Sequence, residues 1–343
     1  MTVTLADVAV HAGVSPATVS RVLNGNYPVA TGTRQRVLDA VRTLNYVVNA
    51  HARALAVNTS DVLGVLVNNV SDPFFALMAG AVQREAARED LLAMIGNTGG
   101  SPVEELRYIR LLLRQRVRAI VLTGGHRDDA DYLAELAELV RHAVASDTRV
   151  VFCGRPPVPG CPAITLDFDN RRGAQALTRY VLTVGHRRIG YITGPAGHST
   201  THARLHGHTD ALAERGFSVD EDLVVSGTFD RESGWEAATR LLSAPEPPTA
   251  IIAANDTVAL GVLAAAREAG IAVPAGLSVA GFDDLPFSMD AYPALTTVRL
   301  PLVAAGQRAG RIALGEEPLA PGTVATVRTE LIVRDSVSGP GER

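Results

Sequence analysis

The sequence of 343 residues contains no lysine, two cysteines, one tryptophan and few aromatic residues. Cys153 and Cys161 cannot build a disulfide framework, which excludes a small disulfide-stapled scaffold. No apolar run approaches the roughly 20 residues that span a bilayer. The first residues, MTVTLADVAVHAG, have neither the basic region nor the apolar core of a secretory signal. These absences, with 47% hydrophobic residues, predict a globular cytoplasmic protein with a sizeable core.

The charge is distributed unevenly along the chain, although its formal net value is only -4. Residues 1–58 hold five arginines and two acidic residues, a net charge of +3, so the remainder carries -7. A basic segment joined to an acidic body favours a polyanionic partner for the segment alone. The alternative is that the asymmetry arose by chance.

Residues 4–44 have the pattern of three short helices. Thr4 and Asp7 have the spacing of a capping box at the start of the first helix. Ser15 is placed to cap the second helix, with Pro16 at its first position, where a missing N–H costs nothing. Thr33 is the predicted start of the third. Two helices joined by the turn at residues 12–14, with one supporting helix, are typical of a helix-turn-helix unit.

The second helix of such a unit enters the major groove and presents its N-terminal residues to base edges. Pro16 and Ala17 are small enough to touch a thymine methyl, and Arg21 can donate two hydrogen bonds to a guanine. Asn24 can reach a base or a phosphate, and Thr33 lies at a helix start that suits a phosphate. The sequence therefore favours DNA binding over the alternative of a helical cap on an enzyme.

From residue 62 onward, apolar runs alternate with helical stretches. This alternation predicts parallel sheets built from right-handed βαβ units, in two doubly wound lobes. The predicted strands lie at residues 62–67, 91–96, 119–123, 150–154, 189–194, 250–255 and 278–283.

The segments TLADVAVHAGVSPATVSRVLNG and TRQRVLDAVRTLNYVVNAHARAL resemble the head and hinge of the lactose-repressor (LacI/GalR) family of bacterial transcription regulators. The resemblance continues through DPFF, GHRRIGYITGP, ARLHG, ANDTVALGVLAAAREAGIAVPAGLSVAGFDD, PALTTVR and TELIVRDS, and covers nearly the whole chain.

The resemblance implies an α/β protein: an all-α helix-turn-helix head, a hinge helix, and two lobes of the type I periplasmic-binding-protein-like kind. We expect the head at 1–58, with the hinge helix at about 49–57, and an effector-binding and dimerisation domain at 59–343. The expected N-lobe is about 60–160 plus 293–322, and the expected C-lobe about 163–290 plus 323–338.

The resemblance also implies how the head meets DNA. In a homodimer on a pseudo-palindromic operator, Leu55 is the wedge inserted into the central minor-groove step, with Ala52 beside it. The alternative for Leu55 is a linker residue docked on the body. The residues assigned to DNA are Leu5, Ser15, Pro16, Ala17, Ser20, Arg21, Asn24, Thr33, Asn49, Ala52 and Leu55.

A ligand site is expected where strands of the two lobes end, because ligands of open α/β sheets lie beyond the carboxyl ends of strands. Carboxylate, guanidinium and amide groups around aromatic rings suit a polyhydroxylated ligand. The resemblance places Arg204 and Asp283 in contact with the effector and His198 near it. The alternatives are a turn cap for Asp283 and ordinary core for Phe75 and Phe229. The candidate residues are Asp72, Phe74, Phe75, Thr123, His198, Thr200, Arg204, Phe229, Asn255 and Asp283.

His198, His202 and His206 are four residues apart, a spacing that on a helix can bind a metal. No carboxylate or thiol completes a ligand set, so we expect neither a metal nor a cofactor.

The predicted function is a homodimeric regulator, a repressor by expectation, whose operator affinity is controlled by a sugar or sugar derivative. The alternatives are a periplasmic-type solute-binding receptor and an α/β enzyme. Against an α/β enzyme, the sequence shows neither a nucleophile elbow nor a phosphate-binding loop.

Overall fold

The computed structural model describes residues 3–24, 27–46 and 60–341. The chain divides into two compact units, Met1–Ser60 and Asp61–Arg343. The predicted hinge residues Asn49, Ala52 and Leu55 lie outside the described residues. Within the described ranges, no helix combines the length and apolar character needed to cross a membrane.

The first unit is built from three helices, α1 (Leu5–Ala12), α2 (Pro16–Asn24) and α3 (Thr31–Thr43). The predicted capping box is present, because the Thr4 side chain accepts from the Asp7 amide and Asp7 accepts from the Thr4 amide. Gly13 ends α1 in the left-handed conformation (φ 62°), which sets the sharp turn into α2. A small core joins the three helices: Val8, Ala9, Ala12, Val19, Val22, Val37 and Ala40.

The third helix begins at Thr31, two residues before the predicted start at Thr33. Its N-cap, Ala30, has no side chain that can accept a hydrogen bond from the first turn. The start therefore lacks the usual sequence signal. The Thr33 amide donates to the Ala30 carbonyl oxygen at 2.9 Å, so Thr33 lies in the first turn of α3.

The N-lobe of the second unit contains a six-stranded sheet in the order β11-β5-β4-β3-β1-β2. Its registered pairs are parallel, and β3 is a nearly continuous buried run, as expected for a strand covered on both faces. The strands are β1 (Ser60–Val67), β2 (Leu92–Asn97), β3 (Val117–Thr123), β4 (Arg149–Cys153), β5 (Ile164–Phe168) and β11 (Val324–Val327). The helices of this lobe are α5 (Pro73–Arg88), α6 (Pro102–Arg114), α7 (Ala130–Ala145) and α12 (Leu302–Leu314).

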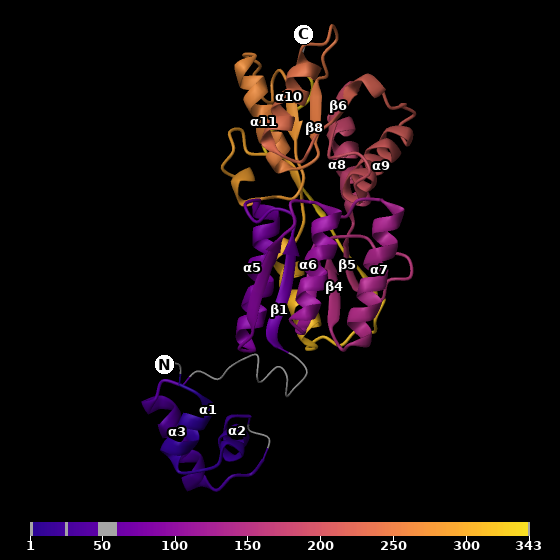
Figure 1. Cartoon of the computed structure of the whole chain (residues 1–343). Coiled ribbons are helices and arrows are strands. Elements are labelled where there is room, and N and C mark those ends of the chain that lie inside the picture. Colours follow the sequence, from indigo (N-terminus) through magenta and orange to yellow (C-terminus); the bar gives the residue numbers. More distant parts are fainter. Residues whose placement is uncertain (1–2, 25–26, 47–59, 342–343) are drawn as a thin grey trace. The chain divides into compact units, whose positions relative to one another are not determined.

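The C-lobe contains a four-stranded parallel sheet in the order β7-β6-β8-β9. Figure 1 shows it above the N-lobe, with β6 and β8 between the helix pair α8 and α9 and the helix pair α10 and α11. The strands are β6 (Ile189–Thr193), β7 (Val224–Ser226), β8 (Ala250–Ala253) and β9 (Ser278–Ala280). The helices are α8 (Asn170–Thr183), α9 (Ser199–Ala213), α10 (Arg231–Leu242) and α11 (Asp256–Glu268).

The predicted lobe boundaries are wrong at two places. Residues 164–168 and 324–327 were expected in the C-lobe, but they form β5 and β11 of the N-lobe sheet. β5 pairs with β4, and β11 pairs with β5, so both extend the N-lobe sheet at its edge. The chain therefore enters the C-lobe after residue 168. Two strands, β10 (Thr297–Arg299) and β12 (Glu330–Ile332), form an antiparallel pair. β10 lies in the segment that precedes α12, and β12 lies in the segment that follows β11.

Candidate functional site

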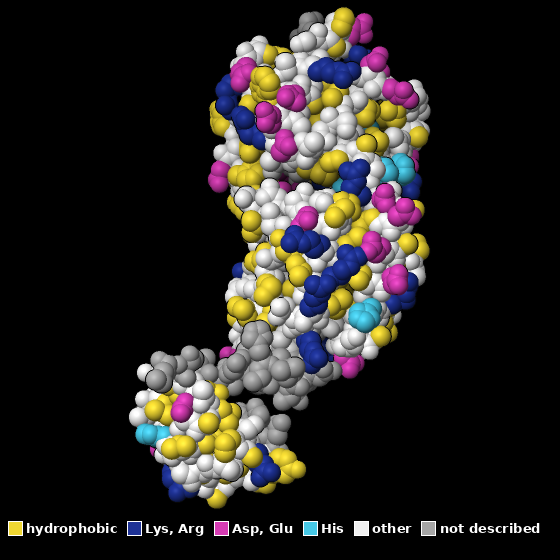
Figure 2. Space-filling view, viewed as in Figure 1, with side chains coloured by type: hydrophobic (Ala, Val, Ile, Leu, Met, Phe, Trp, Pro, Cys, Tyr) yellow, Lys and Arg dark blue, Asp and Glu magenta, His cyan; other side chains and the backbone are white. Residues whose placement is uncertain are grey.

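A cavity of about 560 Å³ lies between the two lobes of the second unit. Figure 2 shows a hollow in the surface at the boundary between the lobes. Its walls are loops that follow the carboxyl ends of strands, which is where ligands of open α/β sheets bind. The N-lobe contributes the segments after β1, β2 and β3, and the C-lobe contributes the segments after β6, β7, β8 and β9.

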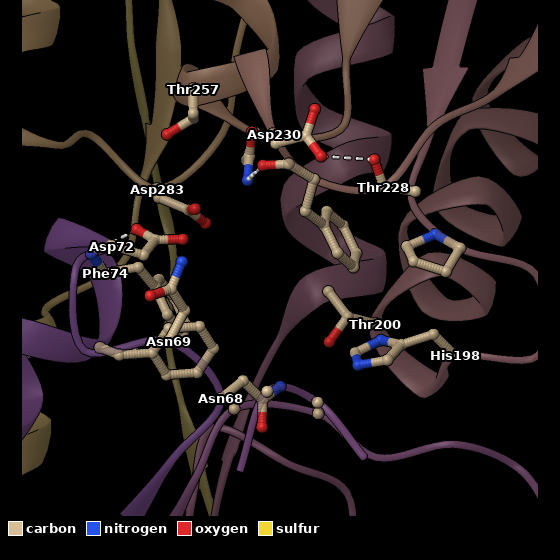
Figure 3. A pocket seen from close by; sticks show the side chains of 18 of the residues that line it. Asn68, Asn69, Asp72, Phe74, His198, Thr200, Thr228, Asp230, Thr257 and Asp283 are labelled. Atoms are coloured by element: carbon tan, nitrogen blue, oxygen red, sulfur yellow. Dashed lines mark hydrogen bonds between the residues drawn. The ribbon is translucent and has the colours of Figure 1, made fainter. Parts of the chain in front are cut away.

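Nine of the ten predicted ligand residues line this cavity. Thr123 does not: it is buried in the N-lobe, and its hydroxyl donates to the Leu66 carbonyl oxygen at 2.9 Å. As the last residue of a central strand, Thr123 is directed at the neighbouring strand β1. In Figure 3, Asp72 and Asp283 lie on one side of the cavity, and His198 and Thr200 lie on the other.

Arg204 is the centre of a buried polar cluster at the C-lobe wall. Its guanidinium donates to Asn170 Oδ1 (2.8 Å), to the Ala254 carbonyl oxygen (2.5 Å) and to Asp283 Oδ1 (2.8 Å). The guanidinium carbon lies 3.7 Å from the centroid of the Phe282 ring, a cation–π contact. Arg204 is therefore held from several directions, and it fixes the position of the Asp283 carboxylate.

Two carboxylic acids of the cavity are easier to protonate than isolated ones. Burial raises the pKa of Asp283 well above its usual range, although the charge of Arg204 opposes the shift. The negative charges of Asp256 and Asp72 raise the pKa of Asp283 further, because like charges repel. Burial also raises the pKa of Asp72, against a hydrogen bond from the Phe74 amide (2.9 Å) that caps α5.

The opposite wall combines a neutral histidine with an aromatic ring. Burial and the nearby positive charges lower the pKa of His198 to about 4, so the imidazole is neutral at physiological pH. Its Nδ1 atom is buried without a hydrogen-bond partner among the described residues. The Phe229 ring lies edge-on to it, with centroids 5.3 Å apart. Phe229 has φ 69°, and its carbonyl oxygen accepts from the Asn255 side-chain amide at 3.1 Å, which holds this uncommon backbone conformation.

Sequence reasoning missed several polar residues of the cavity. Asn68 and Asn69 follow β1, and Asn97 ends β2, so their positions at strand ends were the same signal that marks Asp72. Thr228 and Asp230 follow β7, a short strand that the sequence did not reveal. The other polar lining residues that were not predicted are Ser71, Arg127 and Thr257.

The histidine side chains within α9 and at its N-cap, His198, lie in different surroundings. His202 Nδ1 lies 2.8 Å from Asp128 Oδ2 of the N-lobe. His208 is buried and stacks on Tyr191 with ring centroids 4.4 Å apart. His206 is exposed, and His198 faces the cavity. Among the described residues, no group of three or more histidine, cysteine or acidic side chains could hold a metal ion.

The head presents a polar and cationic face at α2. Ser15, Pro16, Ala17 and Arg21 are exposed, and Ser20 is half-buried, whereas Val19 is buried in the head's core. The Ser15 hydroxyl accepts from the Thr18 amide at 3.2 Å, so it caps α2 as predicted.

The remaining head residues differ in their placement. Leu5 is half-buried against the core of the head, and Thr33 is half-buried in α3. Asn24 ends α2, but its side chain lies outside the described part of the structure. The Arg21 guanidinium lies 5.4 Å from the Tyr27 ring centroid, which restricts its orientation while leaving it exposed. The face at α2 therefore offers exposed small residues and one oriented guanidinium.

Two domain families match the chain. Residues 4–49 match the bacterial regulatory proteins of the lacI family, and residues 178–337 match a periplasmic binding protein-like domain. The first match covers the three helices of the head. The second begins within α8 and covers the rest of the C-lobe, together with α12 and β11 of the N-lobe.

Similar proteins agree with both matches over almost their full length. The HTH-type transcriptional regulator GalR of Escherichia coli (strain K12) is 37% identical over 340 residues, which are 98% of this chain and 96% of the relative. The solved lac repressor dimer, bound to operator and the anti-inducer ONPF, is 25% identical. It has a TM-score of 0.82, with 98% and 100% of the two chains covered. A solved complex of the transcriptional regulator CelR with cellobiose is 31% identical, with a TM-score of 0.70 and coverage of 97% and 99%. The chain therefore belongs to the lacI family of bacterial DNA-binding transcriptional regulators.

Proposed function

We propose that this protein represses transcription as a homodimer on a pseudo-palindromic operator and that an uncharged sugar bound between its lobes controls the operator affinity. The observation that carries the proposal is the inter-lobe cavity with Asp283 held by Arg204. Such a ligand contacts both lobes, so its binding stabilises one relative orientation of the lobes over another. A differential affinity of about 1–3 kcal/mol suffices to couple the two sites.

The chemistry of the cavity favours a polyhydroxylated ligand. Carboxylates at Asp72, Asp230 and Asp283 accept hydrogen bonds from hydroxyl groups, and carboxamides such as Asn69 both donate and accept. The Phe74, Phe75 and Phe229 rings provide apolar surface for the C–H face of a sugar ring. The related regulator CelR was solved in complex with cellobiose, which supports a sugar as the class of ligand here.

The charge of the cavity favours an uncharged sugar over a phosphorylated one. Three aspartates line it against two arginines, and the Arg204 guanidinium is engaged by Asp283, Asn170 and the Ala254 carbonyl oxygen. Arg127 is then the other cationic side chain among the lining residues. Phosphate recognition relies on several charge-assisted donors, so this balance is unfavourable for a phosphate.

A thermal-shift screen of the full-length protein tests the ligand class. The probes are glucose, galactose, cellobiose, glucose 6-phosphate, hypoxanthine and guanine at equal concentrations. Because a ligand that binds the folded state alone stabilises it by mass action, we expect a higher melting temperature with a neutral sugar. A shift with the sugar phosphate or with a purine, and none with the neutral sugars, would contradict the proposed ligand class.

The raised pKa values of Asp72 and Asp283 predict a pH dependence of sugar binding. A carboxyl group with a raised pKa gains a proton as the pH falls through that pKa, and the protonated oxygen then no longer accepts a hydrogen bond from a sugar hydroxyl. We expect the sugar to bind roughly tenfold more weakly at pH 5 than at pH 8. His198 stays neutral over this range because its pKa is about 4, so it does not contribute.

Calorimetric titration at several pH values measures this dependence. Asp283→Asn removes one of the titrating groups and should flatten the profile while lowering the affinity at pH 8. If the affinity of the unaltered protein is constant from pH 5 to pH 8, neither aspartate accepts a hydrogen bond from the ligand in its charged form.

Arg21→Ala tests how the head reads DNA. The exposed guanidinium on α2 can bond a guanine edge, and its loss should cost about 1–3 kcal/mol of affinity for the cognate operator, with relaxed preference at one base position. Competition binding against operators with single base changes measures both effects. An equal loss of affinity for random DNA would assign Arg21 to a phosphate instead.

We also propose that the protein binds its ligand without transforming it and that it acts in the cytoplasm, where the operator is found. In support, the Asp72 carboxylate caps α5, and the Asp283 carboxylate is bonded to Arg204. Both acids therefore hold the architecture of the site, and the relatives are regulators of transcription.

A further inference from the structure

A short N-lobe loop reaches across to the C-lobe at one side of the cavity. It follows β3 and consists of residues 125–128, and it faces residues 197–202 at the start of α9. The Ser199 amide donates to the His126 carbonyl oxygen (2.9 Å), and the His126 amide donates to Ser199 Oγ (3.0 Å). The Asp128 amide donates to the Gly197 carbonyl oxygen at 2.7 Å. Arg127 and His198 thus form an antiparallel bridge between the lobes.

Gly125 permits this close approach. A Cβ atom at Gly125 would lie 2.6 Å from His198 Cε1 and 2.8 Å from Ser199 Oγ, and closer still to Thr200 Oγ1, all in the C-lobe. These separations are well below ordinary van der Waals contact, so a methyl group would displace the side chains of Ser199, Thr200 and His198 and disturb the bond from the His126 amide to Ser199 Oγ. Gly125 has no positive φ angle, and an alanine there would strain the contact between the lobes rather than its own backbone.

The Asp128 side chain adds a second, partly exposed contact between the same two segments. Asp128 Oδ2 lies 2.8 Å from His202 Nδ1 of the C-lobe, and Asp128 Oδ1 lies 3.5 Å from His126 Nδ1 of its own lobe. The backbone pairing at His126 and Ser199 is buried, whereas the pair of Asp128 with His202 is partly exposed. The buried hydrogen bonds therefore contribute more to this contact than the partly exposed hydrogen bond between His202 and Asp128.

The loop is fixed on its N-lobe side by a buried ion pair. Arg155 is fully buried, its Nε donates to the Gly124 carbonyl oxygen (2.9 Å), and its two terminal nitrogens donate to the Glu105 carboxylate (3.0 and 2.9 Å). The loop thus moves with the N-lobe, and separating the lobes would break its bonds to α9.

We propose that residues 125–128 and 197–202 form an inter-lobe clasp that sets effector affinity by holding the lobes closed. Gly125, Arg127, His198 and Thr200 of this clasp also line the cavity, whereas Ser199, Asp128 and His126 do not, so these last three act as positioning residues. This inference rests on the proposed ligand site between the lobes. When the binding-competent closed state is less populated, the apparent affinity falls by the same factor.

Gly125→Ala in the full-length protein tests the clasp, with Gly80→Ala as the matched control. Gly80 lies in α5, and its Cβ would meet only Arg84 Nη1 at 3.6 Å, an ordinary contact. Hydrogen exchange of peptides spanning 124–129 and 196–202 reports the clasp without any ligand. Calorimetry with the sugar that shifts the melting temperature most reports its effect on binding.

We expect Gly125→Ala to speed exchange in both peptides and to weaken sugar binding by about tenfold, while Gly80→Ala changes neither. Because Gly125 lines the cavity, the affinity of a second variant separates the clasp from a direct effect on the site. Ser199→Ala removes the acceptor of the His126 amide outside the lining, adds no bulk, and should also speed exchange and weaken sugar binding. Asp128→Asn should weaken binding by less than about fivefold, because the contact of Asp128 with His202 is partly exposed.

Unchanged exchange in Gly125→Ala and Ser199→Ala would overturn the clasp. Faster exchange with unchanged sugar affinity in Ser199→Ala would overturn its role in binding, whatever the affinity of Gly125→Ala. If no sugar binds the unaltered protein, the proposed ligand class fails, and the exchange comparison still decides between a clasp and a passive contact.

Discussion

Replacing Arg204 with methionine will weaken sugar binding by roughly 10-fold to 160-fold, because the ligand loses a charged acceptor at Asp283 and a hydrogen bond to a charged group is worth about 1.5–3 kcal/mol. The substitution removes the donors to Asp283, Asn170 and the Ala254 carbonyl oxygen at once. The Asp283 carboxylate is then buried without its counter-charge and takes up a proton, so it no longer accepts as an anion. Titration calorimetry with the sugar found by thermal shift measures the loss.

Two further variants separate this effect from a general loss of structure. Arg204→Lys keeps the charge but not the planar fork of donors, so it should recover only part of the affinity. Arg171→Met removes an exposed arginine that pairs with Asp210 on the neighbouring helices α8 and α9, and it should leave sugar binding unchanged. Operator binding should persist in all three variants. A folded Arg204→Met protein that binds the sugar normally would show that the cluster does not hold the ligand.

Replacing Arg155 with methionine will lower the free energy of unfolding of the second unit by about 3–5 kcal/mol. Its guanidinium and the Glu105 carboxylate form a bidentate pair, and the Tyr132 hydroxyl donates to the same carboxylate at 2.6 Å. Burial alone would raise the pKa of Glu105, but the charge and hydrogen bonds of Arg155 outweigh it, so the pKa lies below its usual value. Removing Arg155 leaves this charge unpaired, and thermal denaturation should show a fall of roughly 5–15 °C.

A second substitution identifies the unpaired charge as the cause. Glu105→Leu together with Arg155→Met should recover most of the lost stability, because a matched apolar pair is often as stable as a buried ion pair. Arg179→Met breaks an exposed bidentate pair with Glu214 and should shift the melting temperature by less than about 2 °C. If the double variant is no more stable than the single one, lost packing against the Phe152 ring explains the effect instead.

The head was predictable from the sequence because its signals are local. Thr4 with Asp7, and Ser15 with Pro16, mark helix starts by their own side chains, and the structure confirms both. The start of α3 was missed because Ala30 carries no such signal. The lobe boundary was missed for a different reason: whether Ile164–Phe168 joins one sheet or the other depends on pairing with β4, which is a property of the fold.

The lining of the inter-lobe cavity was predictable as far as strand ends could be located. Asp72 comes after a run that the sequence marks as a strand, Asn255 and Asp283 end two other such runs, and all three line the cavity. Thr123 follows the same rule but is directed into the N-lobe, because side chains alternate between the two faces of a strand. The contact of Gly125 with the C-lobe depends on the relative placement of two lobes, and no local pattern encodes it.

Operator binding with and without a sugar tests the central claim most directly. Fluorescence anisotropy with a pseudo-palindromic duplex from upstream of the protein's own gene, against a shuffled duplex, gives the preference of the unliganded protein at fixed salt. We expect preferential binding of the palindromic duplex and a roughly five-fold to 150-fold change in its affinity when a neutral sugar saturates the cavity. Equal affinity for both duplexes, unaltered by any sugar that binds the protein, would contradict a DNA-binding head controlled from the inter-lobe cavity.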